Sequence, residues 1–474
     1  MSAGFHHDEA QYYGRGAAAA AVLVLALLVP GCGGPKSVPM MPPAETGGQA
    51  EHDGSKAPPG AEDEPWWLSG GSPDSAVAPE GVFQAVPGGS IPEVRVLILE
   101  TRKSVRVHVE SGELSIIDSR GDTALSWPVA GEIRFGARGD EVSVSGGGGP
   151  AGQSSSILIT GTEGSFVRIE GRPYRGSLCM AADGQGGLLA INILGMEDYI
   201  RGVLPSEIGY LKEGQYEAFR AQAIASRSYA LSKMPGKRAE RFDLRATVMD
   251  QVYKGVEGEN AEASRAVDET RGVVGLWEGV PITAYYSSCC GGHTADSRIG
   301  WPSKASYPYL YGVRDADRSG MSFCADSRHF RWEESWHGDA LHAILEQTLR
   351  AEFGKSAASF GRIVDMEIEG FSESGRVIAL DIVTDNGSYR VEGDRVRWVL
   401  RPRSADGPIL RSTLFKMDVD RSGGRVAAVR VRGAGNGHGT GMCQSGAIRM
   451  AGLGYSAVEI LVHYYPGITI ESVY

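Results

Sequence analysis

A single carboxylate in an apolar setting is the side chain of this sequence best suited to chemistry. Glu207 follows Leu204 and Pro205 and precedes Ile208, so its carboxyl group is expected to be partly shielded from water. Such a group can hold its proton near neutral pH and act as a general acid. A glutamate beside an apolar residue is more commonly a solvated surface group. The neighbouring segments must therefore show whether Glu207 is a catalytic acid or such a surface group.

Polar side chains follow Glu207 on a segment with helical periodicity. Residues 216–233 carry Ala, Ile and Leu at helical spacing, and their many small residues allow close packing against a neighbour. Gln222 and Tyr229 are seven positions apart, which places them near the same face. Arg227 could hold a ligand carboxylate, or it could pair with an acidic residue in the core. All three are candidate binding residues.

Neutral hydrogen-bonding groups occur at two further places. Gln251 and Tyr253 follow an expected strand, and an amide and a phenol are donors suited to sugar hydroxyl or acetamido groups. The glycine-rich segment around His438 has the spacing Gly-x-Gly-x-Gly, which is neither the dinucleotide fingerprint nor a phosphate loop. His438 and Gln444 could instead line a cleft or orient Glu207, although an isolated histidine is also often structural.

Cysteine and histidine spacing indicates a metal site or a disulfide. Beyond the N-terminal cysteine the chain has five, an odd number for an exported protein. Cys290 and Cys324 with His293 and His329 supply two thiolates and two imidazoles, the ligand set of a closed, structural zinc site. Cys443 could replace one histidine. The alternative is a disulfide between Cys290 and Cys324, favoured by an oxidising compartment.

Composition narrows the class of protein. The 474 residues are 42% hydrophobic and 8% aromatic, enough to bury at least one large core. A formal charge of -11 argues against a nucleic-acid partner, which would require clustered Lys and Arg. The sequence also has no His-Glu-x-x-His motif, which disfavours a zinc peptidase.

The N-terminal region is typical of an exported, lipid-anchored protein. An apolar run at 17–28, preceded by Arg15, is too short to span a bilayer but suits a secretory signal, and Val29-Pro-Gly-Cys32 resembles a lipoprotein processing site. We expect a signal peptide over 1–32 and acylation of Cys32; the alternative is a buried apolar helix with an incidental cysteine. Residues 33–91, rich in Pro, Gly and acidic residues, are expected to form a disordered tether.

The remaining sequence predicts an α+β fold with mostly antiparallel sheet. Period-two alternation beginning at Val94 predicts a β-rich lead-in over 92–193, and a second region of mixed helices and strands, which carries Glu207, is expected over 194–474. Expected strands lie at 94–99, 105–109, 114–117, 157–160, 166–169, 188–193, 273–276, 282–286, 363–368, 377–383, 389–391 and 426–431. Expected helices lie at 216–233, 260–270 and 342–353, followed by two C-terminal helices, the last opened by the capping box Ser456-x-x-Glu459.

Several segments together, in order, resemble the SpoIID/LytB family, the catalytic domain of the stage II sporulation protein D type. They are EDYIRGVLPSE (197–207), AFRAQAIASRSYA (218–230), DQVYKG (250–255), AVDETRG (266–272), YSSCCGGHT (286–294), PYL (308–310) and GHGTGMCQSGA (437–447). The resemblance runs from about Val94 to the C-terminus. It departs from the family at Ile208-Gly209, where Met-Pro is usual after the glutamate.

The resemblance implies a peptidoglycan lytic transglycosylase that cleaves between N-acetylmuramic acid (MurNAc) and N-acetylglucosamine (GlcNAc) and leaves a 1,6-anhydro end. It assigns the catalytic acid and base to Glu207 and includes Ser287 and Ser288 in the substrate-binding segment. One carboxyl group would suffice, because the 6-hydroxyl of the sugar replaces the second carboxylate of an ordinary glycosidase. Some relatives carry zinc near this segment, but the catalytic step requires no cofactor.

The LytB side of the family implies an alternative, a non-enzymatic wall-binding module that enhances an amidase. Under either interpretation the partners would be peptidoglycan strands, possible cell-wall amidases and a membrane reached through the lipid anchor. The expected location is the periplasm or the cell surface. The sequence does not distinguish sporulation from division or wall turnover.

Overall fold

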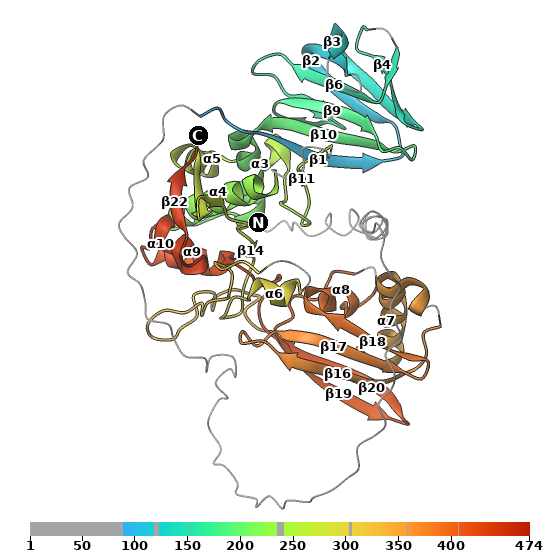
Figure 1. Cartoon of the computed structure of the whole chain (residues 1–474), viewed down its shortest axis with the longest axis vertical. Helices are drawn as coiled ribbons and strands as arrows, with labels where there is room; N and C mark the ends of the chain where they lie inside the picture. The colour runs from blue at the N-terminus through green and yellow to red at the C-terminus, as the bar shows by residue number, and fades with distance from the viewer. Residues whose placement is uncertain are drawn as a thin grey trace, which may run out of the picture. The chain divides into compact units, whose positions relative to one another are not determined.

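A computed structural model describes residues 89–117, 123–149, 151–234, 241–302, 306–357, 359–405 and 407–474. These form two compact units (Figure 1). The larger comprises the described residues between Ser72 and Trp332 together with Arg411–Phe415 and Arg432–Tyr474; the smaller comprises those of Glu333–Leu410 and Lys416–Val431. The predicted signal peptide, Cys32 and nearly all of the predicted tether lie outside the described residues. Within the described residues, no helix combines the length and apolarity needed to cross a membrane.

An 11-stranded sheet begins the larger unit, in the order β11-β1-β10-β9-β6-β2-β3-β4-β5, with β7 pairing both β2 and β8. Every pair is antiparallel except β1 with β11. The strands are β1 (Glu93–Thr101), β2 (Val105–Ile117), β3 (Thr123–Arg138), β4 (Glu141–Gly146), β5 (Gly152–Ser154), β6 (Ser156–Gly161), β7 (Val167–Ile169), β8 (Arg172–Tyr174), β9 (Ser177–Ala182), β10 (Leu188–Gly195) and β11 (Leu244–Arg245).

Alternating side chains account for this sheet. Along β2, Val105, Val107 and Val109 are buried while the residues between them are exposed. The two strands predicted over 105–117 are one strand, because an irregularity in its pairing with β3 between Val109 and Gly112 interrupts the alternation without ending the ladder.

Helices and short strands complete the larger unit. The helices are α3 (Met196–Ile208), α4 (Tyr216–Lys233), η1 (Gly255–Gly258), α5 (Ala261–Glu269), α6 (Ser297–Gly300), α9 (Gln444–Gly452) and α10 (Ala457–Tyr464). The strands β13 (Val280–Pro281), β12 (Val273–Trp277) and β22 (Thr469–Ser472) form one small sheet, and β14 (Tyr286–Ser287) pairs in parallel with β21 (Met442–Cys443). The capping box of Ser456 and Glu459 opens α10 as predicted.

The predicted strand at 282–286 pairs only at its end, in β14. Residues Ile282 to Tyr285 are all buried, and their N–H groups find partners without a continuous ladder: Ile282 donates to the Gly275 carbonyl, Thr283 to the Tyr309 hydroxyl and Ala284 to the Ile282 carbonyl. The apolar run therefore crosses the core as extended chain, because core burial rather than sheet pairing produced its hydrophobic pattern.

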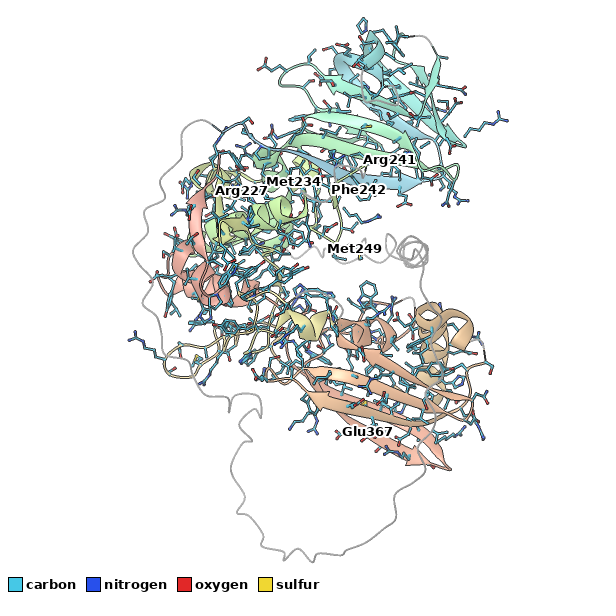
Figure 2. The ribbon with its side chains drawn as sticks, viewed as in Figure 1. Arg227, Met234, Arg241, Phe242, Met249 and Glu367 are labelled. Carbon is cyan, nitrogen blue, oxygen red and sulfur yellow. The ribbon has the colours of Figure 1, made fainter. Side chains whose placement is uncertain are left out.

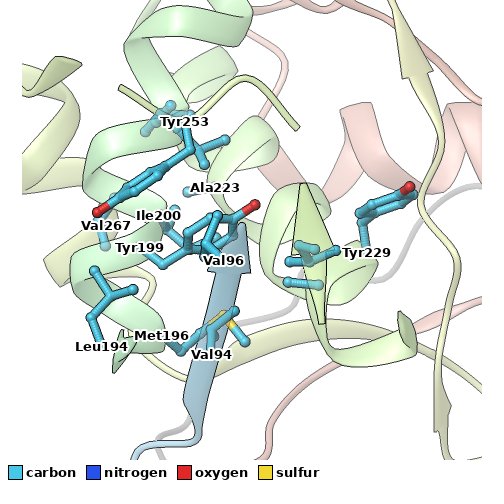
Figure 3. Close-up of a cluster of buried hydrophobic side chains, with 14 of the residues drawn as sticks. Val94, Val96, Leu194, Met196, Tyr199, Ile200, Ala223, Tyr229, Tyr253 and Val267 are labelled. Carbon is cyan, nitrogen blue, oxygen red and sulfur yellow. The ribbon is translucent and has the colours of Figure 1, made fainter. Parts of the chain in front are cut away.

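Sheet and helices share one hydrophobic core. Val94 and Val96 of β1 belong to the same buried cluster as Tyr199 of α3 and Tyr253 (Figure 3). The two tyrosine rings lie 5.2 Å apart, and a Cβ on Gly202 would approach the Tyr253 ring to 2.5 Å. Glycine at 202 therefore lets α3 pack directly on this ring.

The smaller unit contains two three-stranded sheets, β15-β20-β19 and β16-β17-β18. Its helices α7 and α8 lie on one side of the strands in Figure 1. The elements are β15 (Trp332–His337), α7 (Gly338–Phe353), η2 (Gly354–Ala357), β16 (Ile363–Phe371), β17 (Val377–Thr384), β18 (Gly387–Glu392), η3 (Gly393–Arg395), α8 (Val396–Val399), β19 (Phe415–Ser422) and β20 (Arg425–Gly433).

The fold is α+β with mostly antiparallel sheet, as predicted, but the units divide differently from the predicted regions. The prediction placed a boundary between 193 and 194. In the structure β10 runs directly into α3 within one core, and the chain leaves the larger unit at Glu333 to build the smaller one. Alternation and helical periodicity describe single elements, so they did not indicate which elements share a core.

Candidate active site

Glu207 lies in the last turn of α3. The preceding helix residues, Val203 and Leu204, are fully buried, and Ile208 behind it is 7% exposed. The helix ends at Gly209, whose φ of 79° lies in the region favourable to glycine, and whose N–H donates to the carbonyl of Pro205. The departure from the family pattern thus places an apolar residue in the core and a glycine at the turn.

The environment of Glu207 favours its protonated form. Burial raises the pKa of Glu207 to about 7, from an ordinary value of 4.5. The position at a helix C-terminus acts in the same direction, because the last carbonyl groups carry partial negative charge. Two donors oppose the shift: the Val252 N–H at 2.6 Å from Oε1, and the side chain of Gln444. The carboxyl group of Glu207 is therefore able to hold a proton near neutral pH and also able to carry negative charge.

A buried network of hydrogen-bonded amides and hydroxyls extends from Gln444, which donates to the Glu207 carboxyl group. Gln444 Nε2 donates to Gln222 Oε1 at 3.3 Å, and Gln222 Nε2 donates to Ser226 Oγ at 3.1 Å. Gln251 Nε2 donates to the Tyr286 hydroxyl at 2.9 Å. Gln222 and Gln251 are 0% exposed, so the structure assigns them to positioning rather than to direct contact with a ligand.

Arg227 is a structural residue. It lies on α4 in the larger unit (Figure 2), is 0% exposed, and pairs with Glu197 at 2.7 and 3.1 Å. Its remaining amino group donates to the Val273 carbonyl, while Glu197 also accepts from Gly272 N–H and the Tyr474 hydroxyl. Of the two alternatives for Arg227, the structure supports the ion pair in the core.

Two tyrosine candidates are held by partners within the fold. The Tyr229 hydroxyl donates to Asp250 at 3.0 Å, and that of Tyr253 donates to Asn192 at 2.8 Å. Ser288 is half-buried, and its carbonyl accepts from the N–H and hydroxyl of Ser445.

Ser287 is buried, and its Oγ has no hydrogen-bond partner among the described residues. A Cβ on Gly437 would lie 2.6 Å from the Ser287 Cβ, and Gly437 has a φ of 110°. Glycine is therefore required where the segment that carries His438 passes this strand.

His438 belongs to a group of half-buried and buried aromatic rings. Its ring lies 5.0 Å from that of Trp301 and 5.9 Å from that of Tyr285, and Tyr307 lies 6.5 Å from Tyr285. Its Nδ1 accepts from the N–H of Thr440 at 3.1 Å. Among the predicted binding residues, His438 retains partial exposure, so it can contact a ligand.

The structure revises the predicted metal ligands. Cys290 and Cys324 lie together, but His293 Nδ1 contacts the carbonyl of Thr294 and His329 Nε2 contacts Arg328. The groups that join the two cysteines are Cys443 and Asp315. Cys443 was foreseen as a replacement for one histidine, whereas Asp315 has no motif around it. None of the five cysteines in the described chain is in a disulfide.

Sequence reasoning missed contributors of two kinds. The Val252 donor is a backbone group, which no residue type reveals. Tyr286 is the first residue of the segment at 286–294 and Trp301 lies shortly after it, so their aromatic character was the available signal. Tyr286 interacts electrostatically with Glu207, and the Trp301 ring packs near that of His438.

The fold and this site define an α+β protein with one titratable carboxyl group held by a buried amide network. Residues 184–277 match the family model described as Stage II sporulation protein, SpoIID, and residues 304–441 match one described as Domain of unknown function (DUF8618).

Among relatives, an uncharacterized protein of Brachyspira hyodysenteriae is 32% identical over 317 residues, 66% of this chain and 76% of that protein. The Amidase enhancer of Bacillus subtilis is 27% identical over 348 residues, 66% of this chain but only 48% of that protein. Stage II sporulation protein D of Bacillus amyloliquefaciens is 28% identical over 292 residues, covering 58% of this chain and 74% of that protein. The chain belongs to the SpoIID/LytB family.

Proposed function

We propose that this protein is a peptidoglycan lytic transglycosylase in which Glu207 acts first as general acid and then as general base. The observation that carries the proposal is the pKa of Glu207, raised to about 7 by burial and balanced only by the Val252 N–H and the Gln444 side chain. No charged side chain of the described residues is among the causes of this shift, which supports an acid that works without a partner carboxylate.

The reaction needs no second carboxylate. Glu207 donates its proton to the oxygen that links MurNAc C1 to GlcNAc, and the C1–O bond breaks with the electron pair leaving on that oxygen. The resulting carboxylate then takes the proton of the MurNAc 6-hydroxyl as its oxygen bonds to C1. The product carries a 1,6-anhydro ring, Glu207 regains its proton, and no water is consumed.

The surrounding groups fit these two roles. The Val252 and Gln444 donors stabilise the carboxylate that exists between the steps, while burial keeps the starting acid protonated. His438 and Trp301 present partly exposed rings, the kind of surface on which a sugar ring can pack. The buried amide network fixes Gln444 and, through it, the direction of the carboxyl group.

The export signal and lipid anchor expected from the sequence would place this activity at the cell wall. The proposed attachment is acylation of Cys32. The variant Cys32→Ala should no longer incorporate a labelled fatty acid and should leave the membrane fraction. If this variant carries no fatty acid but stays in the membrane fraction, the lipid anchor is refuted.

A second candidate is favoured by the relative named Amidase enhancer. In that function the same site would hold glycan for a separate hydrolase, with no bond broken by this chain. Both candidates predict binding to sacculi, but only the first predicts soluble products from the purified protein alone.

Digestion of purified sacculi separates these functions. Wild-type protein should release soluble muropeptides and Glu207→Gln should not, although the variant should still sediment with sacculi. Glu213→Gln is the matched control, because Glu213 is an exposed glutamate in the loop that follows α3. Equal release by wild type and Glu207→Gln would exclude Glu207 as the acid, and binding without release by wild type would favour the enhancer.

A further inference from the structure

A second cavity-bearing surface lies in the larger unit, beyond the residues that surround Glu207. Its volume is about 1200 Å³, and neither Glu207 nor His438 lines it. Pockets for small ligands usually span about 300–1,000 Å³, so this cavity has room for more than one ring of a polymer. Its described lining includes three aromatic side chains, Trp277, Tyr307 and Tyr309.

A series of neighbouring aromatic rings connects this cavity to the ring of His438. Successive ring centroids lie 5.0, 4.5, 6.5, 5.6 and 5.9 Å apart along the series His438, Trp301, Tyr285, Tyr307, Tyr309 and Trp277. Tyr285 and Tyr309 are buried, whereas the other four residues are half-buried and therefore reach the surface. Half-buried rings backed by buried ones form a surface on which sugar rings can pack.

The fold holds the aromatic rings of the cavity in fixed positions. The Tyr309 hydroxyl accepts from the Thr283 N–H at 2.9 Å. A Cβ on Gly467 would lie 2.8 Å from the Trp277 ring, and Gly467 has a φ of 81°, so glycine lets the chain pass directly against this ring. Because the rings are ordered before a ligand arrives, little side-chain freedom is lost on binding.

The charged groups of the cavity favour a neutral ligand. Glu93, Asp243 and Glu278 supply three carboxylates and Arg95 supplies one guanidinium, a formal net charge of -2. Arg95 Nη2 and Nε donate to Asp243 at 2.7 and 3.2 Å, so the guanidinium pairs with a carboxylate of the cavity itself. A stem peptide carries several carboxylates and would be repelled, whereas N-acetylglucosamine is uncharged and offers hydroxyl donors to the carboxylates.

The chain limits how far this cavity can lie from the proposed catalytic acid. Asp243 lines the cavity, and Val252, whose N–H donates to Glu207 Oε1, is nine positions further on. Nine residues span at most about 32 Å even when fully extended. A glycan strand of several sugars covers such a distance, so one strand can contact both places.

We infer that this cavity is a remote subsite, which binds neutral N-acetylglucosamine residues of the same strand whose MurNAc–GlcNAc bond lies at Glu207. The inference rests on the proposed function, because it extends the binding site of the proposed substrate. Contacts with Trp277 and Tyr307 would hold the strand in place without touching the reacting bond. Long strands should therefore bind more tightly than short ones.

Binding of N-acetylglucosamine oligomers of increasing length to the Glu207→Gln protein tests the subsite without cleavage. Calorimetry should show an affinity that rises with oligomer length. Adding Tyr307→Ala should weaken binding of the longest oligomer about ten-fold and remove the dependence on length. Tyr311→Ala is the matched control, because Tyr311 is 49% exposed and does not line the cavity.

The same measurements separate this inference from the proposed function. An affinity independent of length, or equal weakening by Tyr307→Ala and Tyr311→Ala, would overturn the subsite. Displacement of the longest oligomer by a free stem peptide would also overturn it, because the cavity would then bind peptide. A wild-type chain that shows the expected binding but releases no product from sacculi would refute the transglycosylase and leave the subsite standing.

A labelling experiment needs no change in the cavity and so remains valid if Tyr307→Ala fails to fold. Two long N-acetylglucosamine oligomers, each with a photo-reactive group at one of its ends, are cross-linked to the Glu207→Gln protein and located by peptide mass spectrometry. One of the two should label the peptides that carry Trp277 or Tyr307. Label confined to the peptides around Glu207 and His438 with both oligomers would contradict a remote subsite.

Discussion

The backbone N–H of Val252 donates to Glu207 Oε1 across 2.6 Å, joining the end of α3 to the segment that carries Gln251 and Tyr253. This contact stabilises the carboxylate, whereas burial stabilises the protonated acid, and burial is the larger effect. One carboxyl group therefore has access to both protonation states near neutral pH, as a group that acts first as acid and then as base must.

The rate of glycan cleavage should fall as pH rises through about 7, because the pKa of Glu207 is about 7 and its protonated form starts the reaction. The pH profile of kcat/KM on soluble glycan strands measures this directly. A profile that is flat between about pH 6 and pH 8 would contradict the role of Glu207 as the acid.

Stability should follow the same titration. The folded-state pKa of Glu207 lies above the ordinary 4.5, so its contribution to stability is present below about pH 4.5 and is lost as pH rises through about 7. Glu207→Gln removes this dependence and keeps an oxygen to accept from Val252. We expect the variant to unfold at a higher temperature than wild type at about pH 8, and at a similar temperature at about pH 5.

Gln444→Leu should move the activity profile, which a merely structural residue would not do. Gln444 donates to Glu207 and lowers its pKa, so its removal should shift the midpoint of the profile to higher pH. Losing one donor to the intermediate carboxylate should also reduce kcat by about ten-fold or more. Gln185→Leu, in an exposed turn between β9 and β10, is the control. An unshifted midpoint would remove Gln444 from the site.

The pair of Arg227 and Glu197 should be among the strongest single contributions to stability in the larger unit. Arg227→Leu leaves a buried carboxylate without its cation, and we expect a loss of about 3–5 kcal/mol in the free energy of unfolding. Asp268→Asn removes the exposed partner of Arg201 and should cost less than about 1 kcal/mol. Denaturant unfolding monitored by circular dichroism compares them, and similar losses would contradict a buried, paired Arg227.

Gly202→Ala should destabilise the packing of α3 on Tyr253. The added methyl group would lie 2.5 Å from the ring, a clash that the fully buried surroundings cannot relieve, so we expect a loss of about 1–3 kcal/mol. At Gly300 the same change meets only Thr440 Oγ1 at 3.6 Å and should be nearly neutral. Thermal unfolding of the two variants makes the comparison; equal unfolding temperatures would mean that this contact is loose.

The sequence predicted what depends on local pattern. The alternation of Val105, Val107 and Val109 indicated a strand, and the pair Ser456 and Glu459 indicated a helix start, because both patterns reflect interactions within a few residues. The apolar neighbours of Glu207 likewise indicated its burial, and the raised pKa follows from that burial.

What the sequence did not predict depends on contacts between distant segments. Gln222 and Gln251 have the chemistry of sugar-binding residues, but the fold turns them inward to support Gln444 and Tyr286. His293 follows Cys290 closely in sequence, yet Asp315, which no motif indicated, joins Cys290 in the fold together with Cys443, which the sequence had offered as a replacement for one histidine. Spacing predicted that Cys290 and Cys324 would lie together, whereas the identity of the groups beside them required the tertiary structure.

The most direct test of the central claim is mass spectrometry of sacculus digests made in isotopically labelled water. If the 6-hydroxyl of MurNAc is the nucleophile and Glu207 its acid and base, the products carry 1,6-anhydro ends without solvent oxygen and are absent with Glu207→Gln. Reducing ends that contain labelled oxygen would instead establish hydrolysis by activated water and contradict the account.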